Sequence, residues 1–305
     1  MEHVAAAART VPPPTVPTAV RSRSDLAVFF KRVLNTRGAS FGLAVTALMI
    51  VLAVLADVVA PYSPADQDYD SILQSPSLAH WMGTDNLGRD NLSRIIFGSR
   101  VSIQAGVVAV SIAVTIGTLL GVAAGYWRGW ADDVLMRLCD ALWSFPAIIL
   151  ALFIAAALGP GLINAMIAIG IVFIPVIARL VRGSAMSIRE REFVLAAKVL
   201  GAADVRIMLS HVLPNVLAPV IVQGSLLIAY AIIVEATLSF LGLGVQPPEP
   251  SWGSMLKAAA QYMQTAPWLS FFPGVAIFVT VLGLNLLGDG LRRALDPRLR
   301  GRGEA

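Results

Sequence analysis

Six long stretches of the chain are almost entirely apolar. They are Phe41–Ala60, Val101–Tyr126, Ala141–Gly159, Leu162–Ala178, Val216–Val234 and Ser270–Gly288. A helix that crosses a bilayer needs about 20 mainly apolar residues, with a range of roughly 17–25. The pattern therefore predicts six membrane-spanning helices. The third and fourth are joined by a short turn at residues 159–161, which predicts an antiparallel pair.

Composition supports the same class of protein. Of the 305 residues, 57% are apolar and 14% are charged, whereas soluble domains average roughly 45–50% apolar and 25% charged residues. We therefore expect an all-α integral membrane protein with a single helical membrane domain.

The distribution of basic residues predicts the orientation. With the N-terminus placed in the cytoplasm, 19 of the 23 lysines and arginines lie in cytoplasmic segments and 4 lie outside. Cytoplasmic loops carry such an excess of basic residues. The expected topology has six spans and both termini in the cytoplasm, in a cell membrane.

The segments around the spans have their own patterns. We expect a flexible cytoplasmic tail, an amphipathic helix on the membrane surface, a first transmembrane helix and an outer loop, in that order. The rest is expected to be a five-helix core, which contains a cytoplasmic loop and a second outer loop, and a cytoplasmic tail. These segments cover residues 1–24, 25–37, 38–60, 61–100, 101–290 (with loops 183–215 and 243–269) and 291–305.

Several chemistries lack the residues they need. The basic residues form no single stripe, which argues against nucleic acid as a partner. Cys139 is the sole cysteine, and the three histidines lack metal-ligand spacing, so no metal site is expected. No phosphate-binding loop of the Gly-x-x-x-x-Gly-Lys-Ser/Thr type is present, so the chain itself is not expected to bind ATP.

Acidic side chains are rare in the predicted spans. Glu235 lies at the outer end of the fifth span and Asp289 at the inner end of the sixth, and both are interpreted as charges near water. A self-contained secondary carrier would often place charges in mid-membrane, and an intramembrane enzyme would need a nucleophile and a base there. Both alternatives are therefore disfavoured.

The cytoplasmic loop between the fourth and fifth spans predicts two short helices. The first, Glu190–Leu200, has Phe193, Ala197 and Leu200 on one face. The second is expected to begin near Asp204 as its N-cap. It continues with an apolar stripe of Val205, Met208, Leu209 and Val212.

Two residues shape this loop. Gly201 can take the left-handed conformation that ends one helix and redirects the chain. Pro214 lacks a backbone donor and suits the first turn of the next span. The loop is therefore expected to be a rigid bent element, and the small Ala196 and Ala197 would permit another protein to dock closely.

This spacing resembles the signature loop of permease subunits of ABC-type importers. That signature reads Glu-Ala-Ala, three residues, Gly, nine residues, Ile, one residue, Leu-Pro. Leu195 here replaces the glutamate, His211 replaces the isoleucine, and Glu192 lies one helical turn earlier. The matching residues are Ala196, Ala197, Gly201, Leu213 and Pro214.

Other segments resemble the dipeptide/oligopeptide-type permeases, in particular the C-type partner of the permease pair. The outer segment Gly83-Thr84-Asp85-Asn86-Leu87-Gly88-Arg89-Asp90 resembles theirs. So do Ser144-Phe145-Pro146, residues 235–244 and Pro250-Ser251-Trp252-Gly253. Relatives of this class also carry nickel chelates and opines, so peptides are the expected substrate and other small solutes are the alternative.

The resemblance implies a type I ABC importer permease fold and a set of partners. These are a second permease subunit, two ATPase subunits that bind ATP and Mg²⁺, and an external solute-binding protein. Residues 183–215 would couple the permease to an ATPase, and the outer loops would face the binding protein.

Glycines and prolines mark further positions in the spans. Gly117, Gly121 and Gly125 recur every four residues, which allows close helix contact. We expect this contact within the chain, with the permease–permease interface as the alternative. The prolines that could bend spans are Pro146, Pro175, Pro219 and Pro273.

Overall fold

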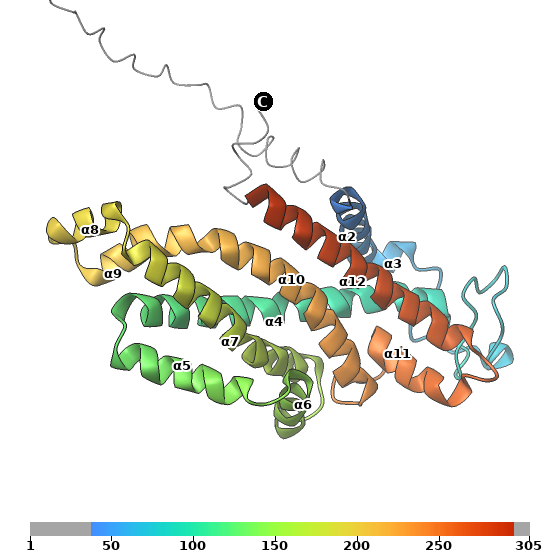
Figure 1. Ribbon diagram of the computed structural model, residues 1–305. Helices are drawn as coiled ribbons and strands as arrows, with labels where there is room; N and C mark the ends of the chain where they lie inside the picture. The colour runs from blue at the N-terminus through green and yellow to red at the C-terminus, as the bar shows by residue number, and fades with distance from the viewer. Residues whose placement is uncertain (1–37, 296–305) are drawn as a thin grey trace, which may run out of the picture.

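The computed structural model describes residues 38–295, and its regular secondary structure is helical (Figure 1). The predicted tail 1–24 and surface helix 25–37 lie outside these residues, as do residues 296–305. The α-helices are α2 (Ala39–Val54), α3 (Ala56–Val59), α4 (Asn91–Trp127), α5 (Trp130–Trp143), α6 (Ala147–Leu158), α7 (Leu162–Arg189), α8 (Glu192–Val199), α9 (Asp204–Ile207), α10 (Leu213–Phe240), α11 (Trp252–Ala259) and α12 (Trp268–Leu295). Short turns of helix lie at Tyr69–Ser71, Met208–Val212 and Ala260–Tyr262.

Within residues 38–295, four helices are long and apolar enough to cross a membrane. They are α4, α7, α12 and the continuous helix Asp204–Phe240, which contains α9 and α10. Helices α5 and α6 pass the same test together as a fifth, and α2 is apolar but has 16 residues. The predicted all-helical membrane class is confirmed, and the number of spans in the described part is four or five by length and composition.

The third predicted span is wrong as a continuous helix. Helix α5 already begins at Trp130, and the chain breaks at residues 144–146 before α6 begins, with an angle of 91° between the two helices. Pro146 stands at this break, because a proline has no N–H to continue the helical pattern. Pro175, Pro219 and Pro273 instead lie inside helices that continue past them.

Several helices extend into segments that are predicted as loops or tails. Helix α4 begins at Asn91, inside the predicted outer loop 61–100, because the Asp90 carboxylate caps it by accepting the Ser93 N–H at 2.8 Å. The second outer loop, 243–269, contains α11. Helix α7 extends into the predicted loop 183–215, and α12 extends into the predicted tail 291–305.

The central contact of the fold is between α4 and α7. A Cβ atom added at Gly117 would lie 2.8 Å from the Ile177 Cβ, and one at Gly121 would lie 2.5 Å from the Ala178 carbonyl oxygen. Gly125 lies equally close to α7. The three glycines therefore let the two backbones approach within this chain.

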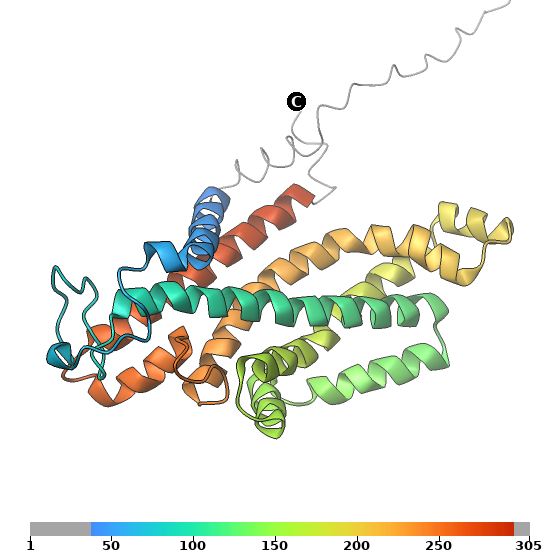
Figure 2. The same cartoon turned by 180° about the vertical axis from the view of Figure 1, so that it is seen from behind.

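The remaining helices pack around this pair. Helix α10 contacts both α4 and α7, and α12 contacts α10. Helix α2 crosses α12 on the side of α10 away from α5 and α6 (Figures 1 and 2). The Arg100 guanidinium holds the end of α2, since it donates to the Ala53 carbonyl at 2.5 Å and pairs with the Asp57 carboxylate at 2.6 Å.

The contact between α4 and α7 gives the first prediction. Gly121→Ala should destabilise the permease by about 1–3 kcal/mol, because the new methyl group overlaps the α7 backbone. Gly183→Ala is the matched control, since no atom outside its own helix lies within 4 Å of a Cβ there. Thermal unfolding of the detergent-purified protein measures both. Equal unfolding temperatures for Gly121→Ala and the parent would contradict this packing.

Candidate functional site

The segment between α7 and α10, hereafter the coupling segment (residues 190–212), lies at one end of the molecule (Figure 1). Helix α8 ends in a Schellman motif: Gly201 donates its N–H to the Lys198 carbonyl, and Ala202 donates to the Ala197 carbonyl. Gly201 has φ +78°, in the left-handed region that favours glycine. The chain thus turns sharply between α8 and α9.

The coupling segment is anchored by a few buried side chains. Val194 and Ile207 are buried in the same core cluster as α4, α7 and α10, and Ala197 packs against that cluster. At the far tip, Val199 is 88% exposed and Leu200 is 86% exposed. An apolar tip that stands free of its own chain is a typical protein interaction surface.

The two short helices expose part of their predicted apolar faces. Phe193 and Leu200 are exposed, because Val194 is the residue that points into the core. In the second stripe, Met208 and Val212 are buried as the helical spacing requires, while Val205 and Leu209 are exposed. The sequence spacing identified the helices, but it did not identify which of their sides meets the core.

Asp204 has a different contact from the predicted one. Ala203 is the N-cap residue, and the Asp204 carboxylate instead accepts a hydrogen bond from the Tyr126 hydroxyl at 2.6 Å. Tyr126 is the penultimate residue of α4, and the Arg189 guanidinium lies 5.5 Å from the centre of its ring. Tyr126 therefore joins three elements: the end of α4, the end of α7 and the start of α9. Nothing in the spacing of the loop residues pointed to it.

The join to α10 is a π turn. The Leu213 N–H donates to the Met208 carbonyl, five residues earlier, rather than four. Pro214 follows at once, and a widened turn accommodates a residue that has no N–H and a bulky ring. The coupling segment therefore continues into α10 without a flexible linker.

The other signature positions lie on the surface of the coupling segment. Glu192 is exposed in the first turn of α8, and Leu195 and Ala196 are exposed along it. His211 is half-buried, with its ring centre 6.2 Å from that of Phe193.

The predicted outer segment, residues 83–90, builds a compact turn beside the start of α4. One Asp85 oxygen accepts the backbone N–H groups of Leu87 and Arg89 at 2.8 and 3.0 Å, and the other pairs with the Arg89 guanidinium at 2.7 Å. Arg94 lies 3.6 Å from the same oxygen. These contacts satisfy the buried carboxylate and fix the turn.

Hydrogen bonds and close backbone contacts also fix the neighbouring residues of this segment. Asp90 bonds to the His80 ring at 3.0 Å, and a backbone bridge pairs it with the fully buried Thr84. Gly83 and Gly88 both have positive φ, and a side chain at Gly88 would collide with the Asp68 backbone. The segment is thus a folded cap rather than an open loop.

The interpretation of Glu235 as a charge near water is wrong. Its side chain has no exposed surface, and one of its oxygens accepts the Ser239 hydroxyl at 2.7 Å. Burial results because α11 folds back on α10, with Gly253 directly against the Ala236 carbonyl. Asp289 is exposed on α12, as a charge near water would be.

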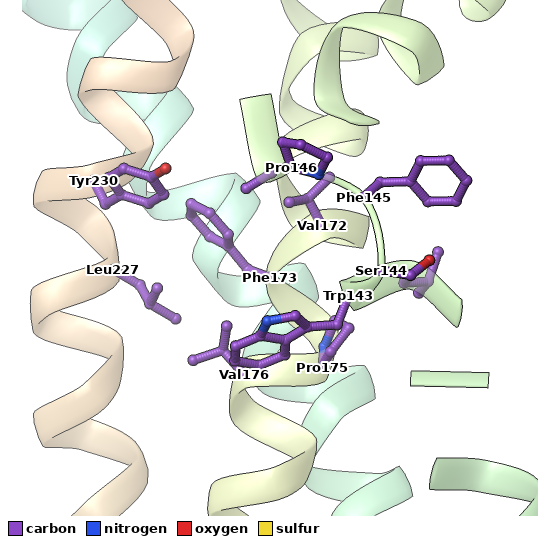
Figure 3. Close-up of a pocket in the computed structure, with 12 residues that line it drawn as sticks. Trp143, Ser144, Phe145, Pro146, Val172, Phe173, Pro175, Val176, Leu227 and Tyr230 are labelled. Atoms are coloured by element: carbon purple, nitrogen blue, oxygen red, sulfur yellow. The ribbon is translucent and has the colours of Figure 1, made fainter. Parts of the chain in front are cut away.

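A cavity of about 390 Å³ lies at the break between α5 and α6 (Figure 3). Its walls come from the end of α5, the break itself, α7 and α10. Phe173 from α7 and Tyr230 from α10 stack with their ring centres 5.5 Å apart, and Trp143 closes the α5 side. No local sequence pattern predicted this cavity, because its shape depends on the break.

Two ion pairs fix α5 to α7, and the second of them adjoins the cavity. Arg182 donates two hydrogen bonds to the Asp132 carboxylate, at 2.5 and 2.6 Å. Arg179 pairs with Asp140 at 2.6 Å and lies 4.1 Å from the ring centre of Trp143, a cavity wall residue.

Comparison with known proteins gives two family matches. Residues 117–301 match the family described as "Binding-protein-dependent transport system inner membrane component". Residues 24–76 match the "N-terminal TM domain of oligopeptide transport permease C".

Individual relatives cover nearly the whole chain. The dipeptide transport system permease protein of Alkalihalophilus pseudofirmus is 46% identical over 271 residues, which are 89% of each chain. The glutathione transport system permease protein of Pectobacterium atrosepticum is 45% identical, over 89% of this chain and 91% of its own. The glutathione transport system permease protein of Escherichia coli is 47% identical, over 83% and 84%.

The Tyr126 contact gives the second prediction. Tyr126→Phe removes the hydroxyl that binds Asp204, so backbone amides of α8 and α9 should exchange hydrogen faster, by roughly fivefold if the bond contributes about 1 kcal/mol. Tyr62→Phe is the control, since it removes a similar bond to the Ala79 carbonyl in the outer cap. Hydrogen–deuterium exchange followed by mass spectrometry measures both. Unchanged exchange of α8 and α9 in Tyr126→Phe would show that the bond does not hold the coupling segment.

Proposed function

Since the chain belongs to the family of binding-protein-dependent transport system inner membrane components, we propose that it is the C-type permease subunit of an ATP-driven importer that carries short peptides across the bacterial inner membrane. The relatives named above transport dipeptides and glutathione. Glutathione is itself a tripeptide, so a short peptide is the substrate chemistry that these names share. Another small solute, such as a nickel chelate or an opine, is the alternative.

The proposed topology has six spans and both termini in the cytoplasm. Four long apolar helices and the bent pair α5–α6 supply five of these spans. Residues 38–60 supply the sixth span, because α2 and α3 together cover the apolar stretch predicted as the first transmembrane helix. The distribution of 19 basic residues on one side and 4 on the other supports this orientation. The coupling segment then faces the cytoplasm, and the cap formed by Asp85 and Asp90 faces outward.

The observation that carries the proposal is the exposed apolar tip of the coupling segment. Val199 and Leu200 stand free of the chain, on a short hairpin whose two ends continue into α7 and α10. A cleft on a partner ATPase would bind this tip. The partner ATPases, two in the complete complex, bind ATP and Mg²⁺, and the chain itself holds neither.

The coupling segment must be rigidly connected to the membrane helices if it is to transmit movement to them. Gly201 sets the turn, Tyr126 binds Asp204, and the π turn before Pro214 continues directly into α10. When the ATPases close on ATP, the coupling segment would move as one body and tilt α7 and α10. Interfaces with two discrete arrangements, rather than flexible loops, transmit such work.

We propose two further partners for this chain, a solute-binding protein and a second permease subunit. The outer cap would receive a solute-binding protein that delivers the peptide. A second permease subunit would complete the path, and a heterodimer is the proposed pairing.

The third prediction tests the coupling segment. Gly201→Pro forces φ to about −65°, which the turn at Gly201 cannot adopt. The complex should still assemble, but transport should fall more than roughly tenfold, the effect expected of about 1.4 kcal/mol lost in coupling. ATP hydrolysis should no longer respond to the loaded binding protein. Transport and hydrolysis are measured in proteoliposomes that contain the whole complex.

Gly159→Pro is the control variant for that experiment. Gly159 also has positive φ, and no atom lies within 4 Å of a Cβ added there, but it lies between α6 and α7, away from the coupling segment. It should retain coupling. Transport by this chain without ATPase subunits, or parental coupling in Gly201→Pro, would contradict the proposed role and favour a self-contained carrier.

A further inference from the structure

In the proposed topology, the break between α5 and α6 is an irregular backbone at membrane depth. It faces Val172 and Val176 of α7, inside the apolar run that predicts the fourth span. Residues 144–146 leave the helical pattern, and Pro146 has no N–H. Such backbone does not face lipid; it occurs where it is buried in protein or lines a water-filled cavity. The cavity of Figure 3 lies at this break.

The walls of the cavity suit an apolar side chain. Phe173 and Tyr230 present stacked rings, and Trp143 stands across from them (Figure 3). Its volume of about 390 Å³ falls within the roughly 300–1,000 Å³ that is usual for ligand pockets, which are mostly apolar with a few polar groups.

A charged pair lies at the edge of the cavity. Arg179 and Asp140 pair at 2.6 Å, and the Arg179 guanidinium rests on Trp143. Both remain well exposed in this chain, so each retains capacity for another partner. A short peptide carries an ammonium group and a carboxylate, which match these two charges. A lipid chain would match neither.

The cavity is also built from the two helices that leave the coupling segment. Phe173 and Val176 lie on α7, and Leu227 and Tyr230 lie on α10. A tilt of either helix changes the distance between these walls. The cavity can therefore open and close with the movement that the coupling segment transmits.

Resting on the proposed function, we infer that this cavity is a subsite for the transported peptide, in which the aromatic walls hold an apolar side chain beside the Arg179–Asp140 pair. The subsite binds the peptide on its way through the permease. It adds a preference for bulky apolar side chains to whatever selection the binding protein makes.

The test compares two peptides that differ in size. Transport of diglycine and glycyl-tryptophan is measured in proteoliposomes with the full complex, for the parent and for Val176→Phe, which fills the cavity. The ratio of kcat/KM for glycyl-tryptophan to that for diglycine should fall roughly tenfold or more, the discrimination that a small change in an apolar pocket supplies. Affinity for the binding protein cancels when this ratio is compared with that of the parent.

Two further variants complete the test. Tyr230→Ala removes a wall instead of filling the space, and it should also lower the ratio. Phe153→Ala is the control, because Phe153 is an exposed aromatic residue of α6 that does not line the cavity; its ratio should equal that of the parent.

The outcomes separate the two proposals. Parental ratios in both Val176→Phe and Tyr230→Ala, with diglycine transported normally, would overturn the subsite and leave the importer function intact. A variant that lowers transport of both peptides equally, and whose complex loses the second permease subunit on purification, would show that a helix of the partner subunit, not the peptide, occupies the cavity. A parent complex that transports no peptide at all would contradict the proposed substrate.

Discussion

The close contact between α4 and α7 is the constraint on which the other features depend. Gly117, Gly121 and Gly125 let the two backbones meet, and any larger residue there would overlap α7. Because apolar side chains gain nothing by leaving lipid for a protein interior of similar polarity, close packing has to hold membrane helices together. With α7 fixed on α4, the C-terminal end of α7 lies beside Tyr126, and its middle faces the break before α6.

Helices α7 and α10 position both functional features, the coupling segment and the aromatic cavity. The C-terminal end of α7 and the N-terminal end of α10 hold the coupling segment, which has a buried anchor at Val194 and an exposed tip at Leu200. In the middle the two helices form two walls of the aromatic cavity. At its C-terminal end, α10 is covered by α11, which buries Glu235. One pair of helices therefore links the surface proposed to meet an ATPase to the proposed path of the peptide.

The sequence predicted the helical membrane class and the helix–Gly–helix loop, because apolar runs and a glycine at a turn are local signals. The left-handed conformation of Gly201 is such a case. Contacts between distant segments left no local signal. The bond between Tyr126 and Asp204 joins residues 78 positions apart, and Glu235 became buried only through α11. Pro146 was among four prolines that could bend a span, but the break itself was not predicted, because the residues on both sides are apolar enough for one span and composition alone does not distinguish a bent pair from a straight helix.

The most direct measurement is photo-crosslinking from the tip of the coupling segment in the assembled complex. A photoreactive amino acid at position 200 is compared with one at position 78, where Leu78 is 96% exposed in the outer cap. The account predicts a crosslink from position 200 to an ATPase subunit, and none to an ATPase from position 78. An ATPase crosslink from position 78, or none from position 200 in a complex that transports peptide, would contradict the coupling role and the orientation together.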